Sequence, residues 1–151
     1  MCGRSHYLRD CSCLDSAGVR LVHQASRRGA PLKSGPPART TSVAALEGRV
    51  AGMYKLGANF PDLGAHVASA TYVVDPRVQG RGIGRALAEH SLDRARSEGF
   101  LAMQLNYVVS TNAPAVELYR KLGFAVVGTL PAAFRHRTLG LVDVYVMHRF
   151  L

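Results

Sequence analysis

The sequence lacks any run of about eighteen apolar residues, the least that a membrane-spanning helix needs. Its first residues, Met1 to Arg4, lead into polar and charged residues and not into an apolar segment, so we expect no secretory signal. Asp10 and Asp15 argue against an organelle transit peptide. We therefore expect a cytoplasmic protein that has no membrane partner.

Cysteine is confined to the start of the chain, at Cys2, Cys11 and Cys13, and the 138 residues after Cys13 contain none. No disulfide and no cysteine-based metal site can therefore hold the main body of the chain, which fits a reducing compartment. We expect that the function requires no metal.

Aromatic residues are scarce where the positive charge is highest. Residues 1–41 carry seven Lys or Arg against two Asp, which is +5 of the chain's net +9, and Tyr7 is the one aromatic residue among them. A basic balance favours an anionic partner, and nucleic acid, a membrane surface and a phosphate-rich cofactor all qualify. The lack of aromatic rings on which bases could stack argues against nucleic acid.

The length of 151 residues allows one domain with a substantial core. Residues 27–41 read RRGAPLKSGPPARTT, which is typical of a loop or linker. The residues before them show no sustained period of 2 or 3.6. We therefore divide the chain into a basic N-terminal segment, residues 1–41, which is partly loop, and a core, residues 42–151.

In the core, apolar periodicity and turn residues predict the order β-β-β-α-β-α-β-β. The expected strands cover residues 42–46, 50–56, 66–74, 101–106, 125–130 and 142–150, and the expected helices begin near Gly82 and Asn112 and end at Gly99 and Gly123. A short turn centred on Gly48 joins the first two strands, and a loop containing Pro131 and residues 135–137 joins the last two. This order indicates an α/β fold whose sheet cannot be wholly parallel.

A glycine-rich turn, Gln79-Gly80-Arg81-Gly82-Ile83-Gly84-Arg85, lies between the third strand and the first helix. Glycines let the backbone approach an anion, and the N–H groups at a helix start point outward, which predicts a phosphate site. The dinucleotide pattern needs a third glycine where Arg85 stands, and a P-loop needs Gly-Lys-Ser/Thr, so both are excluded. On the glycines alone, an ordinary strand-to-helix turn stays open.

The pattern Gln79-x-x-Gly82-x-Gly84, after a strand that ends Val-Val-Asp-Pro, resembles the acyl-CoA pyrophosphate loop of the GNAT superfamily of N-acetyltransferases. Asn112, Tyr119 and the sequence Leu-Gly-Phe at residues 122–124 resemble the second motif of that family, N-x(6)-Y-x-x-L-G-F. The resemblance covers residues 42–151. It implies a GNAT-like acyl-CoA N-acyltransferase fold, in which a mixed, mostly antiparallel central sheet has flanking helices.

The resemblance also implies acetyl-CoA as the co-substrate and assigns roles to residues. Val73 and Val74 would pair through their backbone with the pantetheine arm, and residues 79–85 would bind the pyrophosphate. Asn112 would contact the cofactor, and Tyr119 would protonate the CoA thiolate as it leaves.

The chemistry of acyl transfer supports the role of Tyr119 apart from the resemblance, because a phenol O–H within hydrogen-bond reach can protonate a leaving thiolate. Tyr119 also lies on an apolar helical stripe with Leu118 and Leu122, so a packing role stays open.

The base that takes a proton from the acceptor amine is not identified. Some family members carry a carboxylate on a central strand, but residues 66–74 and 101–109 contain no Asp or Glu. His66, Tyr107 and His136 are candidates, because histidine titrates near neutral pH and either residue type can order a water. Tyr107 and His136 are also the candidates for contact with the acceptor.

The chain departs from the family at its front, where members normally place a strand and two helices that form one wall of the acceptor pocket. Residues 1–41 show no such pattern. We expect an N-acetyltransferase that acetylates a primary amine of a small molecule, either an amino acid or an amine-bearing inhibitor, and a homodimer is compatible with this. The alternatives are a catalytically impaired acyl-CoA-binding module and an acetyltransferase acting on protein N-termini or lysines.

Overall fold

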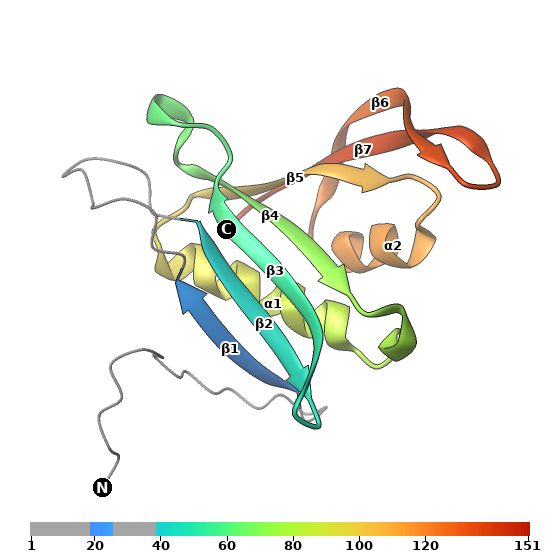
Figure 1. Cartoon of the computed structure of the whole chain (residues 1–151). Helices are drawn as coiled ribbons and strands as arrows, with labels where there is room; N and C mark the ends of the chain where they lie inside the picture. The colour runs from blue at the N-terminus through green and yellow to red at the C-terminus, as the bar shows by residue number, and fades with distance from the viewer. Residues whose placement is uncertain (1–18, 26–38) are drawn as a thin grey trace, which may run out of the picture.

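The computed structural model describes residues 19–25 and 39–151 of the chain. Most of the predicted N-terminal segment, residues 1–18 and 26–38, lies outside the described residues. Within them, seven strands form one sheet with two α-helices packed on it (Figure 1). The elements are β1 (Arg20–Ala25), β2 (Thr40–Leu46), β3 (Arg49–Ala58), β4 (Val67–Val74), α1 (Ile83–Ser97), β5 (Ala102–Val109), α2 (Ala113–Lys121), β6 (Ala125–His136) and β7 (Gly140–Phe150), with 3₁₀ turns at Asp62–Gly64 and Pro76–Val78.

The sheet has the strand order β1-β2-β3-β4-β5-β7-β6. Its pair β4 and β5 is parallel, and every other neighbouring pair is antiparallel. This confirms the predicted mixed, mostly antiparallel sheet and the order of elements from β2 to β7. Neither α-helix in the described part of the chain is long and apolar enough to cross a membrane.

Strand β1 was not predicted from the sequence. It pairs antiparallel with β2, from Arg20 opposite Ala45 to Ala25 opposite Thr40, and it adds Leu21 to the core. Its residues, RLVHQA, do not alternate between apolar and polar, so the sequence carries no period-2 signal for a strand here. A strand therefore precedes the first hairpin. Of the strand and two helices that family members normally place there, the described residues include only this strand.

The last hairpin corrects the prediction that a loop begins at Pro131. Strand β6 continues to His136, and the turn covers residues 137–139. The pairing with β7 shifts register between Leu130 and Phe134, and Ala132 has φ 53°, so a β-bulge accommodates the proline. Proline is tolerated there because β6 is an edge strand with no further neighbour to receive an N–H group.

Helix α1 lies across the sheet beneath β3 and β4 (Figure 1). Its apolar face, which includes Ile83 and Leu87, is buried as predicted, and Gly99 with φ 84° follows its last turn. Polar contacts fix its position as well: the Tyr54 hydroxyl of β3 lies 2.8 Å from Nδ1 of His90 on the helix. The sequence pattern therefore predicted both the limits of α1 and the face that it buries.

Gly52 of β3 allows α1 to approach the sheet closely. A Cβ atom at this position would lie 2.8 Å from the Val73 carbonyl oxygen and 3.0 Å from Cδ1 of Leu87. The first distance is too short for a methyl group against a backbone atom, and the second would require Leu87 to move, so β4 and α1 pack closely on β3 because residue 52 is glycine.

We expect the substitution Gly52→Ala to lower the free energy of unfolding by about 1–3 kcal/mol, because overpacking forces backbone or helix to move. Urea unfolding followed by circular dichroism measures this. Gly128→Ala is the matched control, since its nearest atom, Cβ of Val146, lies at 3.9 Å and the stability should stay within about 0.5 kcal/mol. Equal effects of the two substitutions would contradict the packing argument.

Candidate active site

Strands β4 and β5 pair over three residue pairs only, from Val67 opposite Ala102 to Ser69 opposite Gln104. Each strand continues for five more residues, so the two parallel strands diverge. A cavity of about 290 Å³ lies where they separate.

The lining of this cavity, which we call the cleft, comes from β4, β5 and α2. It includes Tyr72, Asn106, Tyr107, Asn112 and Tyr119. The structure thus brings together three of the sequence-predicted site residues from two separate elements. The cleft opens between strands because a parallel pair, unlike a hairpin, has no connecting turn to hold its far ends together.

Past its short pairing with β5, strand β4 presents a backbone edge to the cleft. Alternate residues of a strand direct their N–H and C=O groups to opposite edges. The Asp75 N–H donates to the Ala51 carbonyl of β3 at 2.9 Å, so Val73, two residues earlier, also faces β3. The backbone groups of Tyr72 and Val74 therefore point to the edge of β4 on the side of β5, where Tyr72 also lines the cleft. Of the two valines predicted for the pantetheine arm, the structure brings only Val74 to this edge.

The glycine-rich turn, residues 79–85, ends in the start of α1. Gly80 and Gly82 have φ of 77° and 78°, a conformation that costs other residues energy. The first helical hydrogen bond runs from the Ala86 N–H to the Gly82 carbonyl, so the N–H groups of residues 83–85 have no acceptor within the helix. The first turn of α1 contains no acidic residue. This helix start therefore suits an anion.

The two arginines of the turn each lie beside one carboxylate. Arg81 is 3.7 Å from Glu47, and Arg85 is 2.8 Å from Glu89 one helical turn later. These pairs are exposed, and such pairs contribute only about 0–1 kcal/mol. Both guanidinium groups can therefore turn to an anion at a low cost in free energy. Gln79, the first residue of the turn, is also exposed.

Tyr119 projects from α2 into the cleft, beside two other rings. Its ring centroid lies 5.8 Å from that of Tyr72 and 6.0 Å from that of Phe124. Burial raises the pKa of Tyr119 to about 12, so the phenol keeps its proton at neutral pH. The residue thus packs against the core, as its helical position predicts, and its protonated side chain also lines the cleft.

The neighbouring Tyr72, which the sequence analysis did not select, differs in its hydrogen bonding. Its hydroxyl lies 2.7 Å from Oγ of Ser91, and that Oγ donates to the Ala88 carbonyl, so Tyr72 donates to Ser91. Burial also raises the pKa of Tyr72. The Tyr72 proton is therefore committed to α1, whereas the Tyr119 hydroxyl has no partner among residues 19–25 and 39–151.

Asn112 is the N-cap residue of α2, as predicted, and it lines the cleft. Its Oδ1 accepts from the Ala115 N–H at 3.4 Å, which caps the helix. The side-chain amide nitrogen is left to donate toward the cleft, which Asn112 lines.

The three candidate bases lie in different places. Tyr107 lines the cleft, but its hydroxyl donates to the Ala133 carbonyl of β6. His66 donates from Nδ1 to the Leu63 carbonyl at 3.1 Å, and Nδ1 of His136 accepts N–H groups of its own hairpin turn. Neither histidine lines the cleft, so the structure does not bring them to the reaction site.

A chain of side-chain amides links β5 to Asn59, just after β3, and nothing in the sequence indicated it. Nδ2 of Asn106 donates to Oδ1 of Asn59 at 2.6 Å and to Oγ of Ser69 at 3.3 Å. Gln104 in turn donates to Oδ1 of Asn106 at 2.7 Å. Asn59 and Ser69 are far from Asn106 in the chain, so only the fold could show that they meet.

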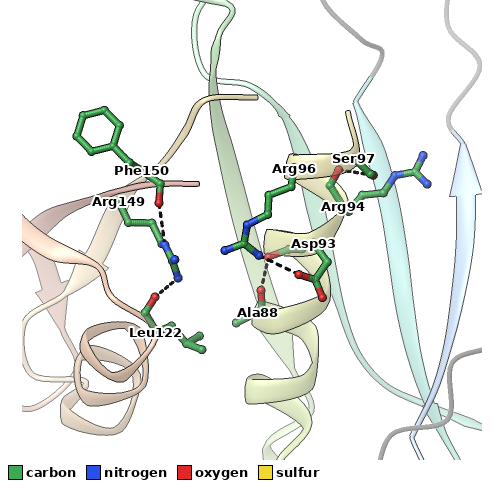
Figure 2. Close-up of polar contacts among 9 residues, drawn as sticks. Ala88, Asp93, Arg94, Arg96, Ser97, Leu122, Arg149 and Phe150 are labelled. Atoms are coloured by element: carbon green, nitrogen blue, oxygen red, sulfur yellow. Dashed lines mark hydrogen bonds and ion pairs between the residues drawn. The ribbon is translucent and has the colours of Figure 1, made fainter. Parts of the chain in front are cut away.

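The far end of α2, which carries Tyr119, is held by Arg149 of β7. Figure 2 shows the Arg149 guanidinium reaching from the strand to the last turn of the helix, where it donates to the Leu122 carbonyl, while Nε donates to the Phe150 carbonyl at 3.1 Å. Gly123, which follows Leu122, has φ 84°, a conformation that favours glycine and lets the chain turn away at the end of the helix. The helix is thus anchored at both ends.

The diverging parallel pair, the helix start that suits an anion and the half-buried Tyr119 fit the class of acyl-CoA-dependent acyltransferases. The chain belongs to the acetyltransferase (GNAT) family, because the sequence model of that family matches residues 12–124. The match begins upstream of residue 42, so it includes part of the segment in which the sequence analysis found no family pattern. Acetyl-CoA is the co-substrate in this family.

Solved structures and curated relatives agree with this. A GCN5-related N-acetyltransferase from Kribbella flavida is 49% identical, with a TM-score of 0.73 over 75% of this chain and 68% of that one. The Salmonella typhimurium protein yncA, solved with its cofactor acetyl-CoA, is 28% identical with a TM-score of 0.66, over 75% of this chain and 65% of that one.

Among curated relatives, the N-acetyltransferase aca1 of Schizosaccharomyces pombe is 29% identical over 73% of this chain. A mycothiol acetyltransferase of Saccharomonospora viridis is 42% identical over 55% of it. The chain spans 54% of the first relative's length and 28% of the second's.

We expect Arg149→Met to lower the free energy of unfolding by about 1–2 kcal/mol, because it removes charge-assisted hydrogen bonds that satisfy the end of α2. Thermal and urea unfolding measure this. The matched control is Arg96→Met, since Arg96 pairs with exposed Asp93 at 2.9 Å and points toward Arg149 (Figure 2). Its stability should change by less than about 0.5 kcal/mol, and a larger loss in the control than in Arg149→Met would contradict the anchoring role.

Proposed function

We propose that this protein is an acetyl-CoA-dependent N-acetyltransferase that acetylates a primary amine of a small molecule, such as an amino acid or an amine-bearing inhibitor. The observation that carries the proposal is the cleft, in which an unpartnered, protonated Tyr119 lies beside the open edge of β4. The names of relatives support amine acceptors of several kinds, since they include a streptothricin acetyltransferase and a ribosomal protein bS18-alanine N-acetyltransferase.

The described residues fit the co-substrate. The open N–H groups of residues 83–85, with Arg81 and Arg85 nearby, suit a pyrophosphate. The free backbone groups of Tyr72 and Val74 suit an arm that carries amides, because such an arm can pair with a strand edge. Asn112 adds an amide donor at the end of the cleft.

Acetyl-CoA supplies the acetyl group as a thioester. Transfer forms a bond between the acceptor nitrogen and the acetyl carbon and breaks the carbon–sulfur bond, whose electron pair stays on sulfur. Tyr119 donates its proton to that sulfur, and its raised pKa keeps the proton in place until then. The acceptor nitrogen loses its proton to water, since no Asp or Glu of the described residues lines the cleft.

Three sequence expectations stay predictions within this proposal. They are the division of the chain at residue 42, with residues 42–151 as the catalytic core, the location in the cytoplasm, and the formation of a homodimer.

We expect Gly82→Val to weaken acetyl-CoA binding at least tenfold. Valine is disfavoured at a φ of 78°, so the turn shifts and loses N–H contacts to the pyrophosphate. Calorimetry measures the affinity. Gly99→Val is the matched control, because Gly99 has φ 84° and equally open surroundings but lies at the other end of α1. Folded Gly82→Val protein with the parent's affinity would refute the phosphate site.

We expect Tyr119→Phe to slow single turnover by about 10²- to 10⁴-fold, because it removes the proton donor and keeps the ring. Acetyl-CoA affinity and melting temperature should change little. The parent's rate should show no loss from Tyr119 ionisation below pH 10, since its pKa is about 12.

The matched control for this substitution is Tyr145→Phe, which removes the hydroxyl of a half-buried tyrosine of β7 outside the cleft. It should keep the parent's rate. A folded Tyr119→Phe protein with the parent's single-turnover rate across the pH profile would leave Tyr119 with a packing role alone.

A further inference from the structure

A second cavity, of about 220 Å³, adjoins the cleft on the side of β2 and β3. The two cavities share Ser69, Thr71 and Asn106 as lining residues, so they are neighbours across β4. We call the second one the cationic cavity, because Arg39 and Lys55 also line it.

Both cations of this cavity are free to meet a ligand. Arg39 precedes β2, and Lys55 of β3 lies directly opposite Thr71 of β4, so the lysine and the threonine share one face of the sheet. Within residues 19–25 and 39–151, neither cation forms an ion pair. No Asp or Glu of these residues lines either cavity, so the two charges act together on an anion that enters.

Arg39 is placed by a glycine. A Cβ atom at Gly57 would lie 2.7 Å from Cγ of Arg39, so the aliphatic stem of the arginine packs directly on the glycine backbone. This contact positions the guanidinium at the cavity even though the residue is exposed.

Asn59 adds a polar group with an unused donor. Its Oδ1 accepts from Asn106 at 2.6 Å, and its Nδ2 is buried without a partner among the described residues. Buried donors are nearly always satisfied in folded proteins, so an unpaired one in the wall of a cavity points to a ligand acceptor atom.

We propose that the cationic cavity binds the carboxylate of the acceptor, so that the substrates are amines that carry a carboxylate in the same molecule. This rests on the proposed N-acetyltransferase function and adds the residues that select the acceptor. Arg39 and Lys55 attract the carboxylate and repel a second positive charge. They also favour the neutral form of the nearby amine, which is the form that attacks.

The test compares four acceptors in a thiol-release assay: an amino acid, its amide, the matching aminophosphonate and a polyamine. The parent should show a kcat/KM for the amino acid at least tenfold above that for its amide, with the polyamine poorest. The aminophosphonate distinguishes a carboxylate site from a phosphate site, and a preference for it would overturn the carboxylate assignment.

Arg39→Gln and Lys55→Gln should each reduce the preference for the amino acid over its amide, and the double substitution should remove it. Acetyl-CoA affinity and melting temperature should stay at the parent's values. The matched control is Arg20→Gln, an exposed arginine that lies opposite Ala45, at the other end of β2 from Arg39, and it should keep the preference.

A parent that acetylates the amide or the polyamine as well as the amino acid would overturn the carboxylate site and leave the acetyltransferase function standing. If no acceptor is acetylated although acetyl-CoA binds, the proposed function fails. Calorimetry with the amino acid then decides about the site: binding to the parent and not to the double variant supports it, and equal or absent binding overturns it.

Discussion

The separation of β4 from β5 leaves backbone N–H and C=O groups of β4 without a strand partner. A buried polar group without a partner costs about 1–3 kcal/mol, so such an edge is stable only where water or a ligand meets it. The strand pairing ends at Ser69 and Gln104. This leaves both a strand edge that can bind a ligand and the cavity beside that edge. Helix α1 starts just beyond β4, which brings its open N–H groups to the same end of the strand.

Tyr72 and Tyr119 are both half-buried, but their hydroxyl groups differ in their hydrogen bonding. The hydroxyl of Tyr72 is held by Ser91 of α1, so it stabilises the contact between helix and sheet. Tyr119 lies on α2, whose ends are fixed by Asn112 and Arg149, and its hydroxyl is left unpaired in the cleft. Burial raises the pKa of both, so both keep their proton, but only the Tyr119 hydroxyl has no hydrogen-bond partner among the described residues.

The core elements could be predicted from the sequence because each carries a local signal. Helix α2 has Asn112 before it and Gly123 after it, and the glycine-rich turn marks the start of α1. Strand β1 and the bulge at Pro131 could not be predicted, since one is held by pairing with β2 and the other by its edge position. Site residues that meet only through the fold, such as Asn59 and Asn106, carry no local signal. The sequence also could not show that Val74 and not Val73 has its backbone groups on the open edge of β4, because this depends on the pairing with β3.

The bulge at Pro131 has a consequence for contacts between molecules. Strand β6 forms one outer edge of the sheet, and an uninterrupted edge can pair with a strand of another chain. The proline lacks an N–H group, and Ala132 with φ 53° turns the backbone out of the extended form. The outer edge is thus divided into two short runs, before residue 131 and after residue 133, neither of which can extend a continuous intermolecular ladder along the whole strand.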